Sequence, residues 1–174
     1  LSAGVAVHAA AAARQAAWEM SVIGLGAALG IAVLMLLSFG SPRAMLLVLG
    51  TVAIGLLVAL SVCVLLFGRV HLLTLVFGAS LVGVAEDYAI HYLSARALAD
   101  QDDRNVLRPM LPALLLAFAT SALGYLALAA APFPGLKQMA LFSIVGLLAA
   151  LLSVLLWFPS LLGPHLPATN FSRS

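Results

Sequence analysis

Long apolar runs separated by short polar turns set the pattern of this 174-residue chain. A helix needs about 20 mainly apolar residues to cross a membrane, because each residue adds about 1.5 Å along the helix axis. Proline and glycine in the turns between the runs end the helices. The pattern predicts five membrane-spanning helices, at residues 20–39, 44–67, 72–97, 109–131 and 139–162.

Two flanking segments lie outside this predicted transmembrane domain, which covers residues 20–163. Residues 1–19 are rich in alanine and include Trp18, so we expect an amphipathic helix at the membrane interface, where a tryptophan ring is half hydrated. Residues 164–174 are expected to form a polar tail. The chain begins with Leu1 rather than methionine, so we expect it to be part of a longer polypeptide.

Composition supports a membrane protein. Hydrophobic residues make up 64% of the chain and charged residues 8%. A soluble domain of this size usually has about 45–50% apolar and about 25% charged residues. The predicted fold class is therefore an all-α integral membrane protein, a bundle of five transmembrane helices.

Several classes of function lack their sequence signals. The net charge of +2 is small and dispersed, which argues against a nucleic-acid partner. The chain has no HExxH motif, no GxSxG motif and no phosphate-binding loop. An intramembrane aspartyl protease needs an aspartate on each of two spans, and only the third span here contains acids. We expect no enzyme activity, no metal site and no cofactor.

The third span carries the candidate chemistry. The stretch Gly83–Tyr92 places two adjacent carboxylates, two tyrosines and a histidine within an apolar helix. Ionisable groups within a membrane cost several kcal/mol unless they are neutralised, paired or hydrated, so they indicate a functional site. The candidate residues are Glu86, Asp87, Tyr88 and His91.

The helical repeat separates the two acids. Residues three, four and seven apart share a helix face, so Asp87 aligns with a stripe of small and polar residues, which we expect to face the bundle interior. Glu86 points about 100° away, over apolar neighbours, and we expect it to be protonated or to reach a partner on another helix. The stripe beside Asp87 consists of Ser80, Gly83, Val84, His91 and Ser94.

Asp87 has no evident counter-ion in the predicted spans. The only lysine or arginine in any of them is Arg96, at the edge of the third, about two and a half turns from Asp87. Three alternatives stay open for Asp87: it is protonated, water reaches it, or its partner belongs to another part of the protein. A structural role, with the carboxylate reaching the interface, is the competing interpretation.

Glycines mark the expected close helix contacts. Gly26 and Gly30 form a GxxxG spacing, which lets a neighbouring helix approach closely. Other glycines within the spans are expected to act in the same way. These are Gly50, Gly55, Gly78, Gly83 and Gly124.

Basic residues predict the orientation, because lysine and arginine favour the cytoplasmic side. One side of the predicted bundle has more of them than the other. We therefore expect the loops around residues 40–43 and 96–108 to be cytoplasmic. The richer side holds Arg43, Arg96, Arg104, Arg108 and Arg173, and the other side holds Arg14, Arg69 and Lys137.

The stretch Gly83–Tyr92 resembles the fourth-helix motif of the resistance–nodulation–division (RND) superfamily, above all that of its MMPL-type branch. The segment Ala119–Tyr125 resembles the fifth helix of that family, and Phe133–Phe142 resembles the loop that leads into its sixth helix. The resemblance runs from about Met20 to Pro164. It implies helices two to six of one half of such a transporter.

The resemblance also implies residue roles. Asp87 matches the proton-relay aspartate, Tyr88 its companion tyrosine, and Thr120 and Ser121 the hydroxyl groups that face it. Glu86 departs from the family pattern, in which that position is more often apolar. The coupling ion would be the proton, without any other cofactor.

The function implied is proton-driven export of lipids or other hydrophobic molecules across the bacterial inner membrane. The implied partners are membrane lipids and a second homologous half of the same polypeptide, whose relay residues meet those of the first half at the centre. We expect the transporter to form an oligomer, and the resemblance does not decide between a trimer and a monomer. Two alternatives are a protein-secretion accessory of the same superfamily and a sterol- or lipid-sensing module that transports nothing.

Overall fold

The computed structural model describes residues 41–98 and 106–162, although the side chains of residues 72, 73, 76–80, 82, 97 and 98 fall outside that description. Nearer the N-terminus it describes a set of helical, exposed residues. These are Arg14, Gln15, Trp18, Ser21, Val22, Gly24, Leu25, Gly26, Leu29, Gly30 and Val33. The bounds predicted for the interfacial helix, the first span and the polar tail lie outside the described residues.

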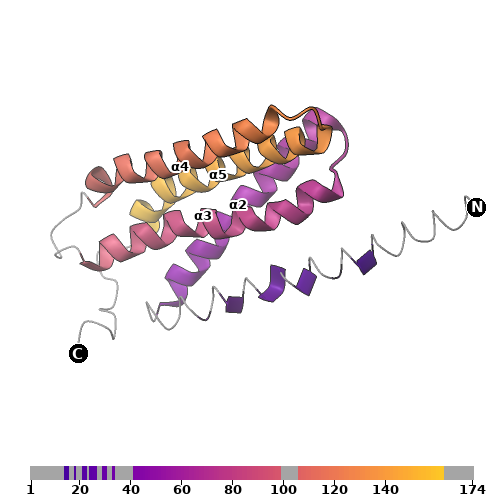
Figure 1. The fold of residues 1–174 in the computed structure, drawn as a ribbon. Coiled ribbons are helices and arrows are strands. Elements are labelled where there is room, and N and C mark those ends of the chain that lie inside the picture. Colours follow the sequence, from indigo (N-terminus) through magenta and orange to yellow (C-terminus); the bar gives the residue numbers. More distant parts are fainter. Residues whose placement is uncertain are drawn as a thin grey trace, which may run out of the picture.

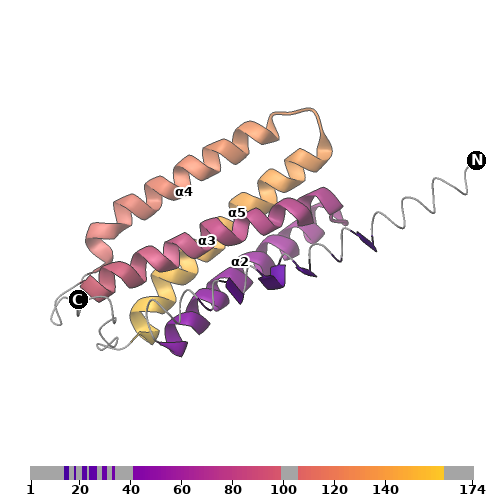
Figure 2. The ribbon, with the colours of Figure 1, turned by 60° about the horizontal axis from the view of Figure 1, so that its bottom comes forward.

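Four helices follow one another up and down in the described part: α2 (Pro42–Phe67), α3 (Leu72–Leu98), α4 (Leu107–Ala129) and α5 (Pro134–Leu161). No strand occurs among the residues that the structure describes. Helix α5 contacts the other three helices, whereas α2 and α4 do not contact each other (Figure 1). The turned view places α2 and α4 on opposite sides of α3 (Figure 2).

The helix ends differ from the predicted spans where prolines are involved. Helix α5 begins at Pro134, five residues before the predicted span, because proline has the backbone angle that a first helical residue needs. Helix α4 begins at Leu107, two residues early, and Pro112 lies inside the helix, as it did in the predicted span. The bounds of α2 and α3 lie within two residues of those predicted.

Three of the described helices, α2, α4 and α5, are long and apolar enough to cross a membrane. Helix α4 is the most open of them, with 6% of its most apolar window buried inside the chain, against 56% for α5. Its outer face carries large apolar residues such as Leu116 and Leu123, which are 66% and 65% exposed. Helices that are apolar on all sides suit a membrane, so the membrane fold class is confirmed.

Local signals in the turns explain the ends of α2. The Ser41 hydroxyl accepts a hydrogen bond from the Ala44 N–H at 3.5 Å, and Pro42 follows as the first helical residue. At the other end, Gly68 adopts a left-handed conformation with a φ of 68° and donates its N–H to the Val64 carbonyl. Glycine meets this requirement without steric cost.

A buried glutamine joins the α2–α3 turn to the start of α5. Gln138 donates from Nε2 to the Arg69 carbonyl at 2.6 Å. Its Oε1 accepts from the His71 N–H at 2.7 Å and from the Thr74 hydroxyl at 3.0 Å. Since Gln138 is fully buried, these bonds hold the starts of α3 and α5 together at one end of the bundle.

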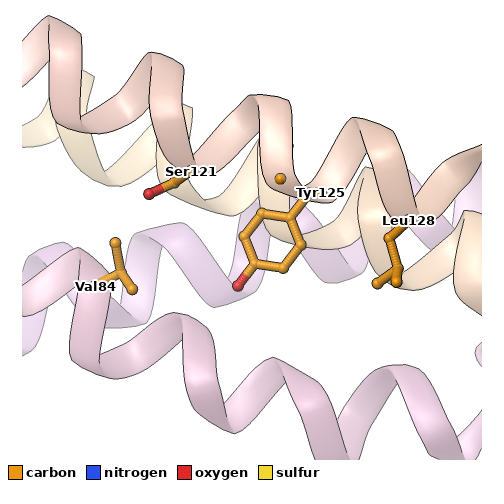
Figure 3. Close-up of a pocket in the computed structure, with 5 residues that line it drawn as sticks. Val84, Ser121, Tyr125 and Leu128 are labelled. Carbon is orange, nitrogen blue, oxygen red and sulfur yellow. The ribbon is translucent and has the colours of Figure 1, made fainter.

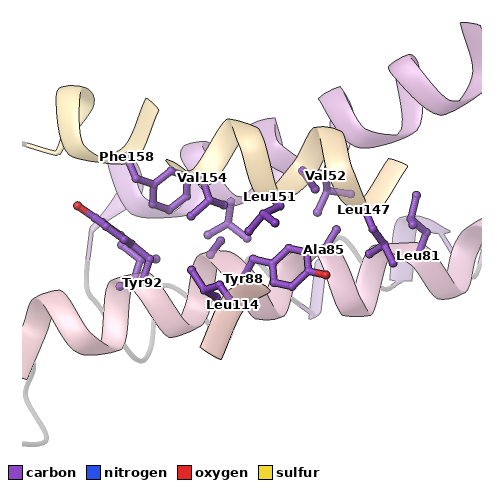
Figure 4. Close-up of a cluster of buried hydrophobic side chains, with 14 of the residues drawn as sticks. Val52, Leu81, Ala85, Tyr88, Tyr92, Leu114, Leu147, Leu151, Val154 and Phe158 are labelled. Atoms are coloured by element: carbon purple, nitrogen blue, oxygen red, sulfur yellow. The ribbon is translucent and has the colours of Figure 1, made fainter. Parts of the chain in front are cut away.

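The core lies where α2 and α3 pack on α5, and α3 and α5 run in the same direction (Figures 1 and 4). Tyr92 packs edge-on against Phe158, with ring centroids 5.4 Å apart and an interplanar angle of 87°. Both side chains are buried, as are those on the preceding turns of each helix. Figure 4 labels Leu81, Ala85, Tyr88 and Tyr92 of α3, Leu147, Leu151, Val154 and Phe158 of α5, and also Val52 of α2 and Leu114 of α4.

One pair of glycines supports the closest helix approach. A Cβ at Gly55 would lie 3.0 Å from the Gly146 carbonyl oxygen, where α2 meets α5, so the predicted packing role of Gly55 is confirmed. A Cβ at any of five other glycines predicted to pack would meet no atom of the described residues within 4 Å, so their packing role stays a prediction. They are Gly26, Gly30, Gly50, Gly83 and Gly124, while Gly78 lies outside the described side chains.

Candidate functional site

The acidic stretch lies in the middle of α3, and its two sides have different surroundings. Tyr88 and Ala89 are buried against the bundle, whereas Gly83, Asp87 and His91 are exposed. The prediction that the Asp87 stripe faces the interior is therefore wrong for the described helices. Helix α5 offers α3 an apolar surface on which the alanine, tyrosine and leucine side chains of α3 pack closely, whereas an ionisable side chain buried there would lack a partner.

The two carboxylates occupy different positions on the helix. Glu86 is half-buried beside the packed face, next to buried Leu93 and half-buried Ile90, whereas Asp87 is exposed. These apolar neighbours of Glu86 are among those predicted from the helical repeat. Neither acid has a hydrogen bond or an ion pair with any residue in the described part of the chain, and His91 has none there either.

Helix α4 forms a groove with α3 beside this stretch. The groove has a volume of about 310 Å³, and it is lined by Val84 of α3 and by Ser121, Gly124, Tyr125 and Leu128 of α4. The Tyr125 ring extends from α4 with its hydroxyl toward α3, and Ser121 lies on the same side of α4, across from Val84 (Figure 3). The groove wall is thus apolar apart from two hydroxyl groups.

The two hydroxyl residues predicted for α4 point in different directions. Ser121 lines the groove and faces α3. Thr120 is exposed and donates its hydroxyl to the Ala117 carbonyl at 3.0 Å, within its own helix. The structure therefore brings Ser121, but not Thr120, to the helix that carries Asp87.

Tyr88 is buried, with 1% of its surface exposed, and its hydroxyl has no hydrogen-bond partner in the described structure. Its ring lies in the core between α3 and α5 (Figure 4). A buried hydroxyl is nearly always hydrogen-bonded in native proteins, so this group calls for a partner such as water.

Sequence reasoning assigned no site role to two polar residues, Tyr125 and Gln138. Tyr125 follows Ser121 by four residues, a spacing that places both on one helix face and could have identified the groove. Gln138 adjoins Lys137 in what looked like a turn, and nothing in the sequence indicated its three side-chain hydrogen bonds. Among the described residues, no group of three or more histidine, cysteine or acidic side chains could hold a metal ion.

Comparison with known proteins identifies the family. The model of the MMPL family matches residues 2–165, which is nearly the whole chain. Neither the curated proteins nor the solved structures include a match. The family match agrees with the all-helical bundle and with its apolar, span-length helices. The chain belongs to the MMPL family and is a multi-pass membrane protein of the RND transporter type.

Proposed function

We propose that this chain forms one half of the membrane domain of a proton-driven exporter of lipids or other amphiphilic molecules. Asp87 is its proton-coupling residue. The observation that carries the proposal is the position of Asp87, exposed in the middle of a 27-residue helix with no basic partner in the described part of the chain.

A carboxylate in such a position has a limited choice of states. In lipid it costs about 2.5–3.5 kcal/mol on insertion scales, so it takes up a proton, meets water or pairs with a group on another segment. The exposed face formed by Gly83, Asp87 and His91 has space for another helix. A second homologous half of the polypeptide, seated on this face, would supply the missing surroundings.

Proton coupling follows from a change in those surroundings. When water reaches Asp87 from one side of the membrane, the carboxylate binds a proton and becomes neutral. Burying the neutral acid costs little free energy, so the two halves can close around it and later reopen toward the other side of the membrane. Tyr88 and Ser121 assist as hydroxyl groups near α3, while Glu86 and His91 hold protons along the same helix.

Thr120 contributes less than Ser121 in this scheme, because its hydroxyl is already bonded to Ala117.

The end of the bundle with the α2–α3 turn faces away from the cytoplasm and carries Arg69 and Lys137. The opposite end, with Arg43 and Arg96, is cytoplasmic, since basic residues favour that side. The membrane is the bacterial inner membrane, and the assembled transporter is an oligomer.

The test uses the full-length transporter in lipid vesicles with a pH gradient. Asp87→Asn keeps the size and hydrogen-bonding capacity of the side chain but cannot ionise. We expect unchanged membrane insertion, and a loss of both proton uptake and lipid export to the level of empty vesicles. Asp102→Asn, an acid outside the predicted spans, is the control and should behave as wild type.

Wild-type proton uptake by Asp87→Asn would contradict the proposal. If Asp87→Asn bound lipid normally and the wild type moved no protons, the sensing module would be the better description. If a secreted polypeptide rather than lipid crossed the membrane in proportion to proton uptake, the secretion accessory would be favoured.

A further inference from the structure

Three basic residues meet at one end of the bundle. Arg69 and His71 lie in and just after the α2–α3 turn, and Lys137 lies in the first turn of α5. The α2–α3 turn and the start of α5 are at the same end of the bundle (Figure 1). The three side chains are exposed, and none has a hydrogen bond or an ion pair within the described part of the chain. We call these three residues the basic cluster.

A buried side chain holds the basic cluster together. Gln138 donates a hydrogen bond to the Arg69 carbonyl at 2.6 Å and accepts one from the His71 N–H at 2.7 Å. Gln138 is fully buried and directly follows Lys137 in the chain. One side chain thus fixes the backbone near all three basic residues. Because the backbone is fixed in advance, a ligand has only the exposed side chains to order when it binds.

No acidic side chain near the basic cluster neutralises it in the described part of the chain. Residues 66–75 and 130–140 contain no acid. Glu86, the first acid of α3, lies about 22 Å along the helix from His71 at 1.5 Å per residue. That separation exceeds the Debye length of about 8 Å at physiological ionic strength, so the Glu86 carboxylate is screened from the cluster. The cluster therefore attracts anions.

The basic cluster lies at the level of the lipid headgroups. Helix α2 ends at Phe67 and helix α5 begins at Pro134, and both helices are apolar enough to cross a membrane. Long basic side chains at the ends of such helices reach the membrane interface. Phe67 and Phe133, close to the cluster in the chain, are 44% and 55% exposed. Exposed rings at this end favour a ligand that has acyl chains over a soluble anion.

We infer that the basic cluster binds the headgroup of an anionic phospholipid. The planar Arg69 guanidinium donates two parallel hydrogen bonds to phosphate oxygens, and Lys137 adds a point charge. His71 offers a ring N–H as a further donor. The acyl chains of the bound lipid lie along the apolar ends of α2 and α5. This site is separate from the proposed coupling residue Asp87 and does not depend on its role.

The experiment measures lipid binding by the full-length transporter in a neutral detergent. Native mass spectrometry counts the lipid molecules retained as phosphatidylglycerol, or phosphatidylcholine with the same acyl chains, is added. We expect the wild type to retain phosphatidylglycerol at the lower concentration. Arg69→Gln combined with Lys137→Gln should lower the affinity for phosphatidylglycerol by about thirtyfold, the factor that two basic residues contribute at an anionic surface. Retention of phosphatidylcholine should not change.

The chain offers two matched controls. Arg43→Gln combined with Arg108→Gln removes the same charge from exposed positions at the opposite end of the bundle and should keep the wild-type affinity. Gln138→Met leaves the charge unchanged but releases the backbone of the basic cluster, so it should weaken phosphatidylglycerol binding severalfold. Thermal unfolding of both double variants should match the wild type, and Gln138→Met is measured below its own unfolding temperature.

Equal retention of the two lipids by the wild type would overturn the inference. Equal loss of affinity in the two double variants would also overturn it, because the effect would then be one of net charge. If inorganic phosphate at the lipid concentration displaced phosphatidylglycerol, the cluster would be a site for a soluble anion and the assignment to a lipid would be wrong. Wild-type affinity in Gln138→Met would contradict the role given to the buried glutamine.

The outcomes also separate this inference from the proposed function. Asp87→Asn should bind phosphatidylglycerol as the wild type does. If Asp87→Asn takes up protons normally, the proposed coupling role fails and the lipid site stands. If the double variant of Arg69 and Lys137 binds phosphatidylglycerol normally, the lipid site fails and the coupling role of Asp87 stands.

Discussion

The Leu81 side chain of α3 lies directly against the backbone of Gly146 on α5, in space that a Cβ at residue 146 would occupy. On the other side, that Cβ would meet the Gly55 carbonyl oxygen at 3.2 Å and the Ala59 Cβ at 3.3 Å. The three helices α2, α3 and α5 thus converge on one glycine. The close packing of these three helices therefore depends on residue 146 having no side chain.

Gly146→Ala should therefore destabilise the bundle. The added methyl group meets a side chain on one side and backbone on the other, and forced repacking of this kind costs about 1–3 kcal/mol. Thermal unfolding in detergent would measure the loss. Gly50→Ala is the matched control, because a Cβ there meets nothing within 4 Å and alanine favours a helix by up to about 1 kcal/mol. Equal stability of the two variants would contradict the packing role of Gly146.

Gln138→Met should weaken the joint between the α2–α3 turn and α5. Methionine has a similar shape but leaves the His71 N–H and the Arg69 carbonyl without their partner, and the buried Thr74 hydroxyl without its acceptor. An unsatisfied buried group such as the Thr74 hydroxyl costs about 1–3 kcal/mol. The measurement is hydrogen exchange at the His71 amide together with thermal unfolding. Lys137→Met, at the adjacent exposed position, should leave both unchanged. Slow exchange at the His71 amide in Gln138→Met would show that the hydrogen bonds of Gln138 are not needed to hold the α2–α3 turn on α5.

Phe158→Leu should loosen the part of the α3–α5 core that lies near the C-terminal ends of the two helices. The substitution removes the edge-on contact with Tyr92, and an aromatic pair of this geometry contributes about 0.5–1.5 kcal/mol beyond its burial. Trp157→Leu makes a comparable change at a half-exposed neighbouring residue. Denaturation in mixed micelles should show a larger loss for Phe158→Leu, and the reverse order would disprove the assignment of this pair to the core.

Glu86→Gln should reduce transport without abolishing it. Glu86 is half-buried at the flank of the packed face, whereas Asp87 is exposed. If Asp87 is the coupling residue, Glu86→Gln keeps part of the proton-driven export, and the double variant with Asp87→Asn is no worse than Asp87→Asn alone. Vesicle export assays on the three variants test this order. Complete loss in Glu86→Gln would show that the two acids share one proton.

Local signals in the sequence were enough to locate the helices. Apolar runs of span length predicted α2, α3, α4 and α5. Gly68 ends α2 in the left-handed conformation that glycine adopts without steric cost. The same signals indicated a membrane protein, and the Gly83–Tyr92 stretch pointed to the family that the comparison confirms. Each of these inferences depends on residues close together in the chain, where backbone geometry and lipid solvation act directly.

Which helix faces meet was decided only by the tertiary structure. Helix α3 has alanine, tyrosine and leucine on one side and small or ionisable residues on the other, and the sequence alone favoured burial of the second side. Packing on α5 buried Tyr88 and left Asp87 exposed, and it placed the close approach at Gly55 and Gly146. In a membrane the surrounding lipid is as apolar as the core, so hydrophobic periodicity cannot select a face, and shape complementarity between helices makes the choice.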